Sequence, residues 1–287
     1  MKRIVLAYSG SAATANSVRW LAVHHGAEVV TLTLDLGQGK ELEAVRDRAF
    51  SIGAARAHVL DVHDQFIRGY LLRAFKAGAL FDGERSLVAA LSRPLIAERL
   101  VEVARIEQAA DVAHTCAPDD DRIAVAVHSL EPALNVIAVP RDGTVAASTP
   151  RPAGPAPKEA AFVDISFERG TPAAINGIAM PLADLVGSLD IIARAHGVVD
   201  ALRVLSAAHR QLQQTVTPKA GDDLRQRYAS IIDRGEWFSP ERADLDAAVT
   251  KAQDKVSGSV RLKLFQGGSE IVSCQPSKPP KKLTVIA

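Results

Sequence analysis

Short apolar runs alternate with amphipathic segments along the first half of the chain. The apolar runs are rich in β-branched residues, which is typical of buried strands. Between the runs, hydrophobic positions recur three and four residues apart, for example at Val18, Leu21 and Ala22, as on one face of a helix. The predicted strands cover residues 4–8, 28–34, 57–60, 111–114 and 135–139. Strands that alternate with helices predict an α/β fold, with a parallel sheet covered by helices on both faces.

The pattern changes after residue 140. Residues 140–160 contain five of the 15 prolines and show no periodicity, which is typical of a linker. Beyond them, residues 161–167 alternate as a strand does, and residues 170–177 have the pattern of a returning hairpin strand. Four helices and a closing hairpin follow, with the helices predicted at 181–196, 198–214, 222–233 and 240–255 and the hairpin strands at 258–265 and 269–273.

This organisation predicts two domains. Residues 1–140 form an α/β domain of nucleotide-binding type, and residues 161–275 form a smaller α+β domain. Residues 141–160 connect the two, and residues 276–287 are a tail rich in proline and lysine.

Composition excludes several classes of protein. The 287 residues include 34 Lys and Arg against 33 Asp and Glu, so no basic excess is present to bind nucleic acid. The first apolar run is four residues long, shorter than a signal peptide needs, and no run approaches a membrane span. Two cysteines, Cys116 and Cys274, are too few for a disulfide scaffold and indicate a reducing compartment. We therefore expect a cytoplasmic protein that contacts neither membrane nor nucleic acid.

The stretch Leu-Ala-Tyr-Ser-Gly-Ser-Ala-Ala-Thr at residues 6–14 resembles the pyrophosphate-binding loop of the argininosuccinate synthase family. That family belongs to the adenine-nucleotide α-hydrolase group. The resemblance extends over most of the chain, through residues 35–43, 76–83, 92–97, 111–114, 174–177, 235–240 and 256–265. It implies an adenine-nucleotide α-hydrolase-like α/β domain and a synthetase domain that builds subunit contacts. It also implies the family reaction, in which ATP activates citrulline as citrullyl-adenylate, aspartate attacks, and AMP and pyrophosphate leave.

The chain departs from the family within this loop. The family reads Ser-Gly-Gly-x-Asp-Thr-Ser, and Ser9, Gly10 and Thr14 match it, whereas Ser11, Ala13 and Ala15 do not. If position 11 needs a positive φ, a residue other than glycine there costs roughly 1–2 kcal/mol. An alanine at position 13 also removes a carboxylate suited to organising Mg²⁺ around pyrophosphate. We expect a weakened triphosphate site.

The resemblance nevertheless marks candidate residues for an adenine nucleotide. ATP or AMP is the cofactor that it implies, with Mg²⁺ only if ATP is bound, and AMP or adenosine is favoured over ATP. The alternative is a relic turn between strand and helix, with Asp35 as an ordinary helix cap. The candidates are Ala7, Tyr8, Ser9, Gly10, Ser11, Thr14, Leu34, Asp35 and Gln38.

The segments that contact citrulline and aspartate in the family differ more strongly in this chain. Where the family has Thr-Gly-Lys-Gly-Asn-Asp-Gln-Val-Arg, the chain has the shorter, acidic run of residues 117–122, which would repel a dicarboxylate. Two family segments that contact citrulline have no counterpart here. The remaining substrate candidates are Phe81, at the position of a family tyrosine, with Arg93, Thr115 and Arg122.

The sequence gives less support to a reactive cysteine or to a metal site. Cys116 follows a predicted strand, and an inert buried thiol is favoured over a reactive thiolate. The run Asp119, Asp120 and Asp121 is interpreted as a solvated loop in preference to a cation site. The histidines do not have the spacing of metal ligands, and His209 is expected on a helix face. No catalytic residue and no metal ligand is assigned.

Two functional hypotheses follow. In the first, the chain is an argininosuccinate synthase-like protein that is degenerate for ligation and acts as a nucleotide-binding or assembly subunit. In the second, it is an active ATP-dependent ligase, for citrulline and aspartate or for an altered substrate. Both include a homo-oligomer, either a dimer or a tetramer, and a full-length paralogue is a further candidate partner.

Overall fold

The computed structural model describes residues 2–37, 41–117, 120–140, 159–198, 200–217 and 222–277. The chain forms two compact units, and each is described by itself. The first unit comprises Met1–Leu71, Asp82–Ser148 and Arg227–Ala243, and the second comprises Leu72–Phe81, Thr149–Gln226 and Asp244–Ala287. The units therefore interleave along the chain and do not coincide with the contiguous blocks 1–140 and 161–275. Residues 141–158 of the predicted linker and 278–287 of the predicted tail lie outside the described residues.

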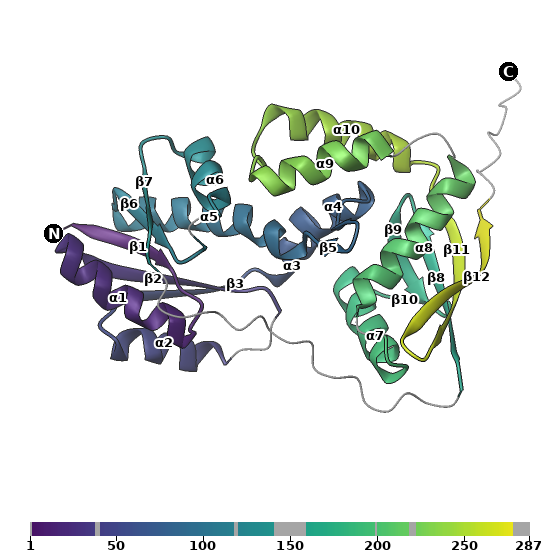
Figure 1. Ribbon diagram of the computed structural model, residues 1–287, viewed down its shortest axis with the longest axis horizontal. Coiled ribbons are helices and arrows are strands. Elements are labelled where there is room, and N and C mark those ends of the chain that lie inside the picture. Colours follow the sequence, from purple (N-terminus) through teal and green to yellow (C-terminus); the bar gives the residue numbers. More distant parts are fainter. Residues whose placement is uncertain are drawn as a thin grey trace, which may run out of the picture. The chain divides into compact units, whose positions relative to one another are not determined.

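A parallel sheet of five strands forms the centre of the first unit (Figure 1). The strand order is β3-β2-β1-β6-β7, and each neighbouring pair is parallel. The strands are β1 (Arg3–Ala7), β2 (Glu28–Asp35), β3 (Arg56–Asp61), β6 (Asp111–His114) and β7 (Asn135–Ala138). The predicted parallel sheet is confirmed, because each run of β-branched residues forms a strand within two residues of its expected limits.

Helices cover both faces of this sheet. On one face, α1 (Ala12–His25) and α2 (Leu42–Ser51) bury Val18, Leu21 and Val45 against residues of β1 and β2. On the other face, α5 (Val88–Glu107) and α6 (Arg122–Leu130) bury Leu100 and Ile123 in a second cluster. Alternate residues of β1 and β2 point into the two clusters, which is why the middle of each strand is mostly apolar.

The sequence pattern ahead of the strand at 111–114 predicts a helix at residues 94–108, and the helix observed there is longer. Helix α5 begins at Val88, so Pro94 lies inside it and not at its first position. Proline there removes a backbone donor, but Ala90, Leu91 and Leu95 on this segment are all buried. The packing of these apolar side chains outweighs the local preference to start at the proline.

Residues 63–76 form helical segments that the hydrophobic pattern did not predict. They are α3 (His63–Phe66), a π-helical turn η1 (Ile67–Leu71) and α4 (Leu72–Lys76). In the first unit, Tyr70 of η1 stacks on Trp237, with ring centroids 5.1 Å apart. Trp237 is a core residue, as its place in a Trp-Phe segment just before a predicted helix indicates. Two short strands follow, β4 (Phe81–Asp82) and β5 (Arg85–Ser86).

The second unit contains an antiparallel sheet with the order β10-β9-β8-β11-β12. Its strands are β8 (Ala161–Glu168), β9 (Thr171–Ile175), β10 (Ile178–Ala179), β11 (Gly258–Phe265) and β12 (Gly268–Pro276). Val163, Ile165 and Phe167 alternate with more exposed neighbours on β8, as the sequence pattern indicated. Strand β12 extends to Pro276, so the predicted start of the tail at residue 276 is wrong.

Four helices accompany this sheet in the sequence: α7 (Leu182–Ala195), α8 (Ala201–Val216), α9 (Asp222–Arg234) and α10 (Pro240–Gln253). Helix α8 packs on the face that carries Phe167, whose ring lies 5.8 Å from that of His209. His209 is thus on the buried face of its helix. No helix within the described ranges is long and apolar enough to cross a membrane.

Candidate functional site

A cavity of about 290 Å³ opens at the carboxyl ends of β1, β2 and β6. The strand order reverses between β1 and β6, and ligands of open parallel sheets bind outside the strands at this kind of position. The residues around the cavity come from the strand ends, from the loops after them and from helices α5 and α6. The cavity is lined by Ala7, Tyr8, Ser9, Leu32, Thr33, Leu34, Leu36, Arg93, Ile96, His114, Thr115, Cys116, Ala117, Asp120 and Ile123.

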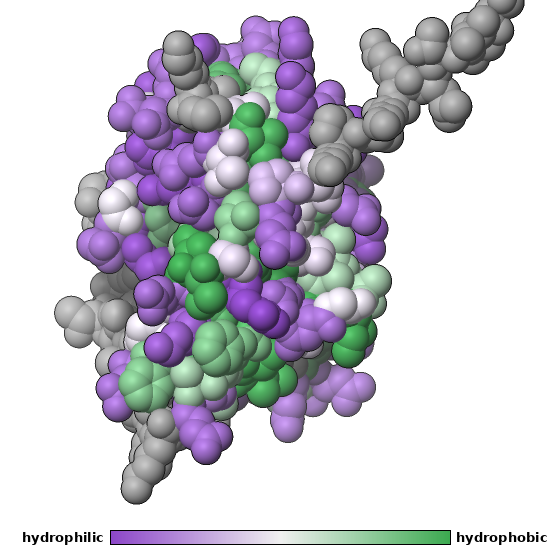
Figure 2. All heavy atoms as spheres, turned by 90° about the vertical axis from the view of Figure 1, so that its right-hand side faces the viewer, coloured by the Kyte–Doolittle hydropathy of each residue, from purple (hydrophilic) through white to green (hydrophobic). Residues whose placement is uncertain are grey.

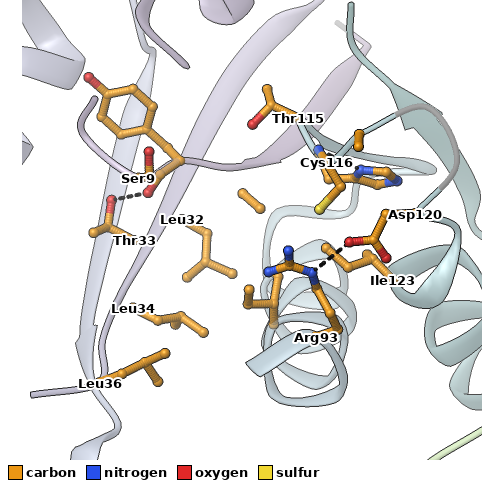
Figure 3. A pocket seen from close by; sticks show the side chains of 15 residues that line it. Ser9, Leu32, Thr33, Leu34, Leu36, Arg93, Thr115, Cys116, Asp120 and Ile123 are labelled. Atoms are coloured by element: carbon orange, nitrogen blue, oxygen red, sulfur yellow. Dashed lines mark hydrogen bonds and ion pairs between the residues drawn. The ribbon is translucent and has the colours of Figure 1, made fainter. Parts of the chain in front are cut away.

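One wall of the cavity is apolar. Leu32, Leu34 and Leu36 stand in a row along β2 and its end, and Figure 3 shows them across the cavity from Arg93 and Asp120. Alternation along the strand puts Thr33 on the other side, where its Oγ1 donates a hydrogen bond to the Tyr8 carbonyl at 2.9 Å. A flat apolar ring suits such a wall, because its faces need no hydrogen-bond partner.

The loop after β1 is shaped by Gly10. Its φ is +73°, in the region that favours glycine, and an added Cβ would lie 2.9 Å from Cγ1 of Val45. Arg48 of α2 donates a hydrogen bond to the Gly10 carbonyl at 2.5 Å. Backbone conformation and packing therefore both require glycine at this position.

Position 11 differs from the sequence expectation. Ser11 has φ −80° and ψ 158°, an extended conformation open to any residue. The strain of roughly 1–2 kcal/mol that a positive φ would impose on serine is therefore absent. Replacement of the family's second glycine does not by itself distort this loop.

Three hydroxyl groups meet at the amino end of α1. The Oγ of Ser9 lies 2.9 Å from that of Ser11 and 3.3 Å from Oγ1 of Thr14. Thr14 also donates a hydrogen bond to the Ser11 carbonyl at 3.0 Å. Hydroxyl groups at a helix amino end are suited to an anionic oxygen, because they can donate while the helix dipole attracts negative charge.

His114 is a neutral group at the edge of the cavity. The backbone N–H of Cys116 donates to its Nδ1 at 3.2 Å, which leaves the proton on Nε2. Burial lowers the pKa of His114; the charge of Arg93 acts in the same direction, and Asp120 acts against both. Cys116 itself is half-buried and lines the cavity, so the buried position expected for its thiol is wrong.

Asp120 is held between two arginines. Nε of Arg93 donates to Oδ2 of Asp120 at 3.1 Å, and Nε of Arg122 lies 3.2 Å from Oδ1. The sequence predicted an acidic loop that repels a dicarboxylate, but the Asp120 carboxylate is compensated. Asp119 lies outside the described residues, and Asp121 precedes the first residue of α6.

The structure brings together some of the predicted site residues and not others. Asp35 accepts a hydrogen bond from the Gly37 N–H at 2.9 Å, in a turn just beyond the cavity-lining leucine Leu34. Phe81 belongs to the second unit, where the Arg203 guanidinium lies 4.4 Å from its ring centre. Gln38 lies outside the described residues. Ala7, Tyr8, Ser9, Leu34, Arg93 and Thr115 line the cavity, whereas Gly10, Ser11, Thr14 and Arg122 lie in the adjoining loop and helices.

Sequence reasoning missed several lining residues. Leu32, Thr33 and Leu36 lie on or beside the strand on which only Leu34 and Asp35 were candidates, and Ile96 and Ile123 lie on helices. The one usable signal was position, because residues at the carboxyl ends of parallel strands share an edge of the sheet.

Comparisons with known proteins agree with the resemblance. Residues 3–149 match the family model of the arginosuccinate synthase N-terminal HUP domain, and residues 199–279 match that of the C-terminal domain. An argininosuccinate synthase of Erythrobacter litoralis is 34% identical over 95% of this chain and 88% of its own length. The argininosuccinate synthase of Nitratidesulfovibrio vulgaris is 34% identical over 94% of this chain and 87% of its own length. The argininosuccinate synthase of Bacillus cereus is 32% identical over 93% of this chain and 85% of its own length.

Proposed function

The chain belongs to the argininosuccinate synthase family, and from that membership we propose that its first unit binds the adenosine part of an adenine nucleotide without joining citrulline to aspartate. The cavity at the carboxyl edge of the parallel sheet carries this proposal. It combines a row of leucines for a base with strand-end backbone for a ribose.

The loss of ligation follows from groups that the family reaction requires. Position 13 is alanine where the family has an aspartate, so the chain offers no carboxylate there for Mg²⁺. The two family segments that contact citrulline are missing from the sequence. A polar substrate without its partners loses about 1–3 kcal/mol for each buried group left unpaired.

AMP or ATP is the cofactor of this proposal, and Mg²⁺ enters only with ATP. The residues present fit one phosphate group, because Ser9, Ser11 and Thr14 place three hydroxyl groups at the amino end of α1. Binding of ATP is therefore expected to be no tighter with Mg²⁺ than without it.

Calorimetry with adenosine, AMP and ATP, with and without Mg²⁺, tests the binding half of the proposal. Pyrophosphate release from ATP, measured with citrulline and aspartate present, tests the other half. We expect saturable adenosine binding and no release of pyrophosphate above the rate without enzyme. Absence of adenosine binding contradicts the first half, and substrate-dependent pyrophosphate release contradicts the second.

One observation favours a second candidate, an active ATP-dependent ligase. Ser11 adopts an extended backbone and Gly10 keeps a positive φ, so the loop does not require the family's second glycine. Arg93 and Thr115 also remain at the cavity. Pyrophosphate release that requires an amine together with a ureido or carboxylate compound would establish this alternative.

We also propose that the chain forms a homo-oligomer through its second unit. Phe162, Ile178, Ile191 and Val272 are large apolar side chains that are exposed on this unit. Figure 2 views the side on which β11 and β12 lie and shows hydrophobic residues gathered within a hydrophilic surround. Light scattering on the purified chain should give a dimer or tetramer, and replacement of Phe162 and Val272 by serine should lower that mass. A monomeric wild type would contradict this proposal.

A further inference from the structure

A second cavity, of about 460 Å³, opens in the second unit, beside the turn between β8 and β9. Its volume is within the range of small-molecule sites, roughly 300–1,000 Å³. Four of its lining residues are charged, namely Lys76 at the end of α4, Glu168 and Arg169 at the turn, and Asp254 just after α10. All of them belong to the second unit, so this cavity, called the Lys76 cavity below, is formed by that unit alone.

The Asp254 carboxylate is bound to Arg169. Its Oδ1 accepts hydrogen bonds from Nη2 and Nε of Arg169, at 2.5 Å and 3.1 Å. Arg169 has φ +48°, in a turn conformation that usually takes asparagine or glycine, and its backbone N–H donates to the Ser257 hydroxyl at 2.9 Å. These contacts hold the turn and its guanidinium against Asp254, so this carboxylate already has a cation as its partner.

The charge of Lys76 is not fully compensated. Its side chain is half-buried, and its ammonium has no salt bridge or hydrogen bond within the parts of the chain that the structure describes. Burial lowers the pKa of Lys76, the charge of Arg169 acts in the same direction, and Asp254 only partly opposes them. A further carboxylate that entered the cavity would therefore stabilise this ammonium.

Glu168 brings a negative charge to the same cavity. Its side chain is exposed, and among the described residues it forms no salt bridge or hydrogen bond, with Lys76 or with any other group. Thr171, which faces Glu168 across the hairpin, and Thr250 of α10 add two hydroxyl groups to the lining. The cavity thus combines one cation and one anion that do not pair with each other, and two groups that can donate or accept a hydrogen bond.

We propose that the Lys76 cavity binds a free α-amino acid, with the carboxylate of the ligand at Lys76 and its ammonium group at Glu168. A zwitterion stabilises both charges, whereas an anion is repelled by Glu168 and a cation is repelled by Lys76 and Arg169. The threonine hydroxyls suit a ligand side chain that is polar and uncharged. This inference goes beyond the proposed function and does not depend on nucleotide binding by the first unit.

The experiment is calorimetric titration of the whole chain with L-glutamine, whose side chain is polar and uncharged. Glutaramic acid is the same molecule without the ammonium group, and 4-aminobutanamide is the same molecule without the carboxylate. We expect saturable binding of glutamine that is about fivefold or more tighter than binding of either analogue. Fivefold corresponds to about 1 kcal/mol, the upper end of the range for an exposed charge pair.

Two variants assign the two ends of the ligand. Lys76→Met keeps the length of the side chain and removes the cation, so the preference for glutamine over 4-aminobutanamide should fall to about twofold or less. Glu168→Gln should lower the preference over glutaramic acid in the same way. Lys251→Met and Glu159→Gln are the matched controls, because they remove the same charges at exposed positions of the second unit that do not line the cavity. The controls should leave both preferences unchanged.

The wild type alone can contradict the inference, so the test holds even if a variant does not fold. Absence of saturable glutamine binding overturns it, and so does glutamine binding no tighter than that of the two analogues. Equal losses in the variants and in their controls, or glutamine binding that neither Lys76→Met nor Glu168→Gln changes, also overturn it. Adenosine binding is measured separately, and its absence contradicts the proposed function without affecting this inference.

Discussion

The Nη1 atom of Arg48 donates a hydrogen bond to the carbonyl oxygen of Gly10, 2.5 Å away. The two residues are 38 positions apart, and the contact ties the loop after β1 to helix α2. The loop that leads into the amino end of α1 is therefore held from outside by a side chain of the next helix.

Replacement of Arg48 by methionine should weaken ligand binding more than stability. Loss of one hydrogen bond to an exposed arginine is worth about 1 kcal/mol or less, which corresponds to roughly a fivefold loss of adenosine affinity if the loop shape is needed for binding. Arg46→Met, on the same helix and with no contact to this loop among the described residues, is the control. Calorimetric titration that shows equal affinities for the two variants would refute a role for the Arg48 contact.

Alanine at position 10 should destabilise the protein through two causes. The positive φ of +73° costs roughly 1–2 kcal/mol for alanine, and the new Cβ meets Val45 at 2.9 Å. Gly26→Ala separates the two causes, because Gly26 has φ +58° and nothing within 4 Å of an added Cβ. In urea unfolding, the free energy of unfolding should fall by about 1 kcal/mol more for Gly10→Ala than for Gly26→Ala. Adding Val45→Ala to Gly10→Ala should not restore the part of the loss that comes from the positive φ. Equal losses would show that Val45 moves aside freely.

Gln253 joins two buried groups in the second unit. Its Oε1 lies 2.9 Å from Nε2 of His209, and its amide donates to the Lys76 carbonyl at 2.8 Å. Gln253→Met keeps the volume but leaves both partners unpaired, so the free energy of unfolding should fall by about 2–4 kcal/mol. Exposed Gln214 on α8 offers a control whose change to methionine should stay within about 0.5 kcal/mol. A loss below about 1 kcal/mol for Gln253→Met would mean that water reaches these groups.

Burial of His209 makes the stability of the protein depend on pH. Burial lowers the pKa of His209 to about 4, because the charged imidazolium is excluded from a site packed by Phe75 and Phe167; the hydrogen bond to Gln253 only partly opposes this. Below about pH 6.5 the unfolded chain binds a proton at this histidine and the folded chain does not. Stability should therefore fall by roughly 3 kcal/mol as the pH drops from about 6.5 to about 4, and then stop changing at this site.

The replacement His209→Gln isolates that dependence. Glutamine places a donor near the position of Nε2 and does not titrate, so the variant should lose the slope between about pH 4 and 6.5 at some cost in stability. Urea midpoints across this range measure the effect. An unchanged slope in His209→Gln would assign the pH dependence to other groups.

The amino-acid pattern determined the class of the fold. Alternation of apolar runs with helical periodicity predicted the parallel sheet, and the run from Leu6 to Thr14 identified the family. These features are local, because each depends on residues within about a dozen positions of one another. The edge of the sheet that carries the cavity also follows from them, since parallel strands place their carboxyl ends together.

The tertiary structure decided the rest. Pro94 lies inside α5 because its apolar neighbours are buried, and Ser11 is unstrained because the positive φ is at Gly10 instead. The arginine partners of Asp120 come from two helices, one of them 27 positions away, and no local pattern indicates such a pairing. Contacts between distant segments depend on how helices pack on a sheet, and that packing is set by the sum of many side chains. The sequence therefore determined most of the elements and the edge of the sheet that carries the cavity, whereas the charge balance inside the cavity became visible only in three dimensions.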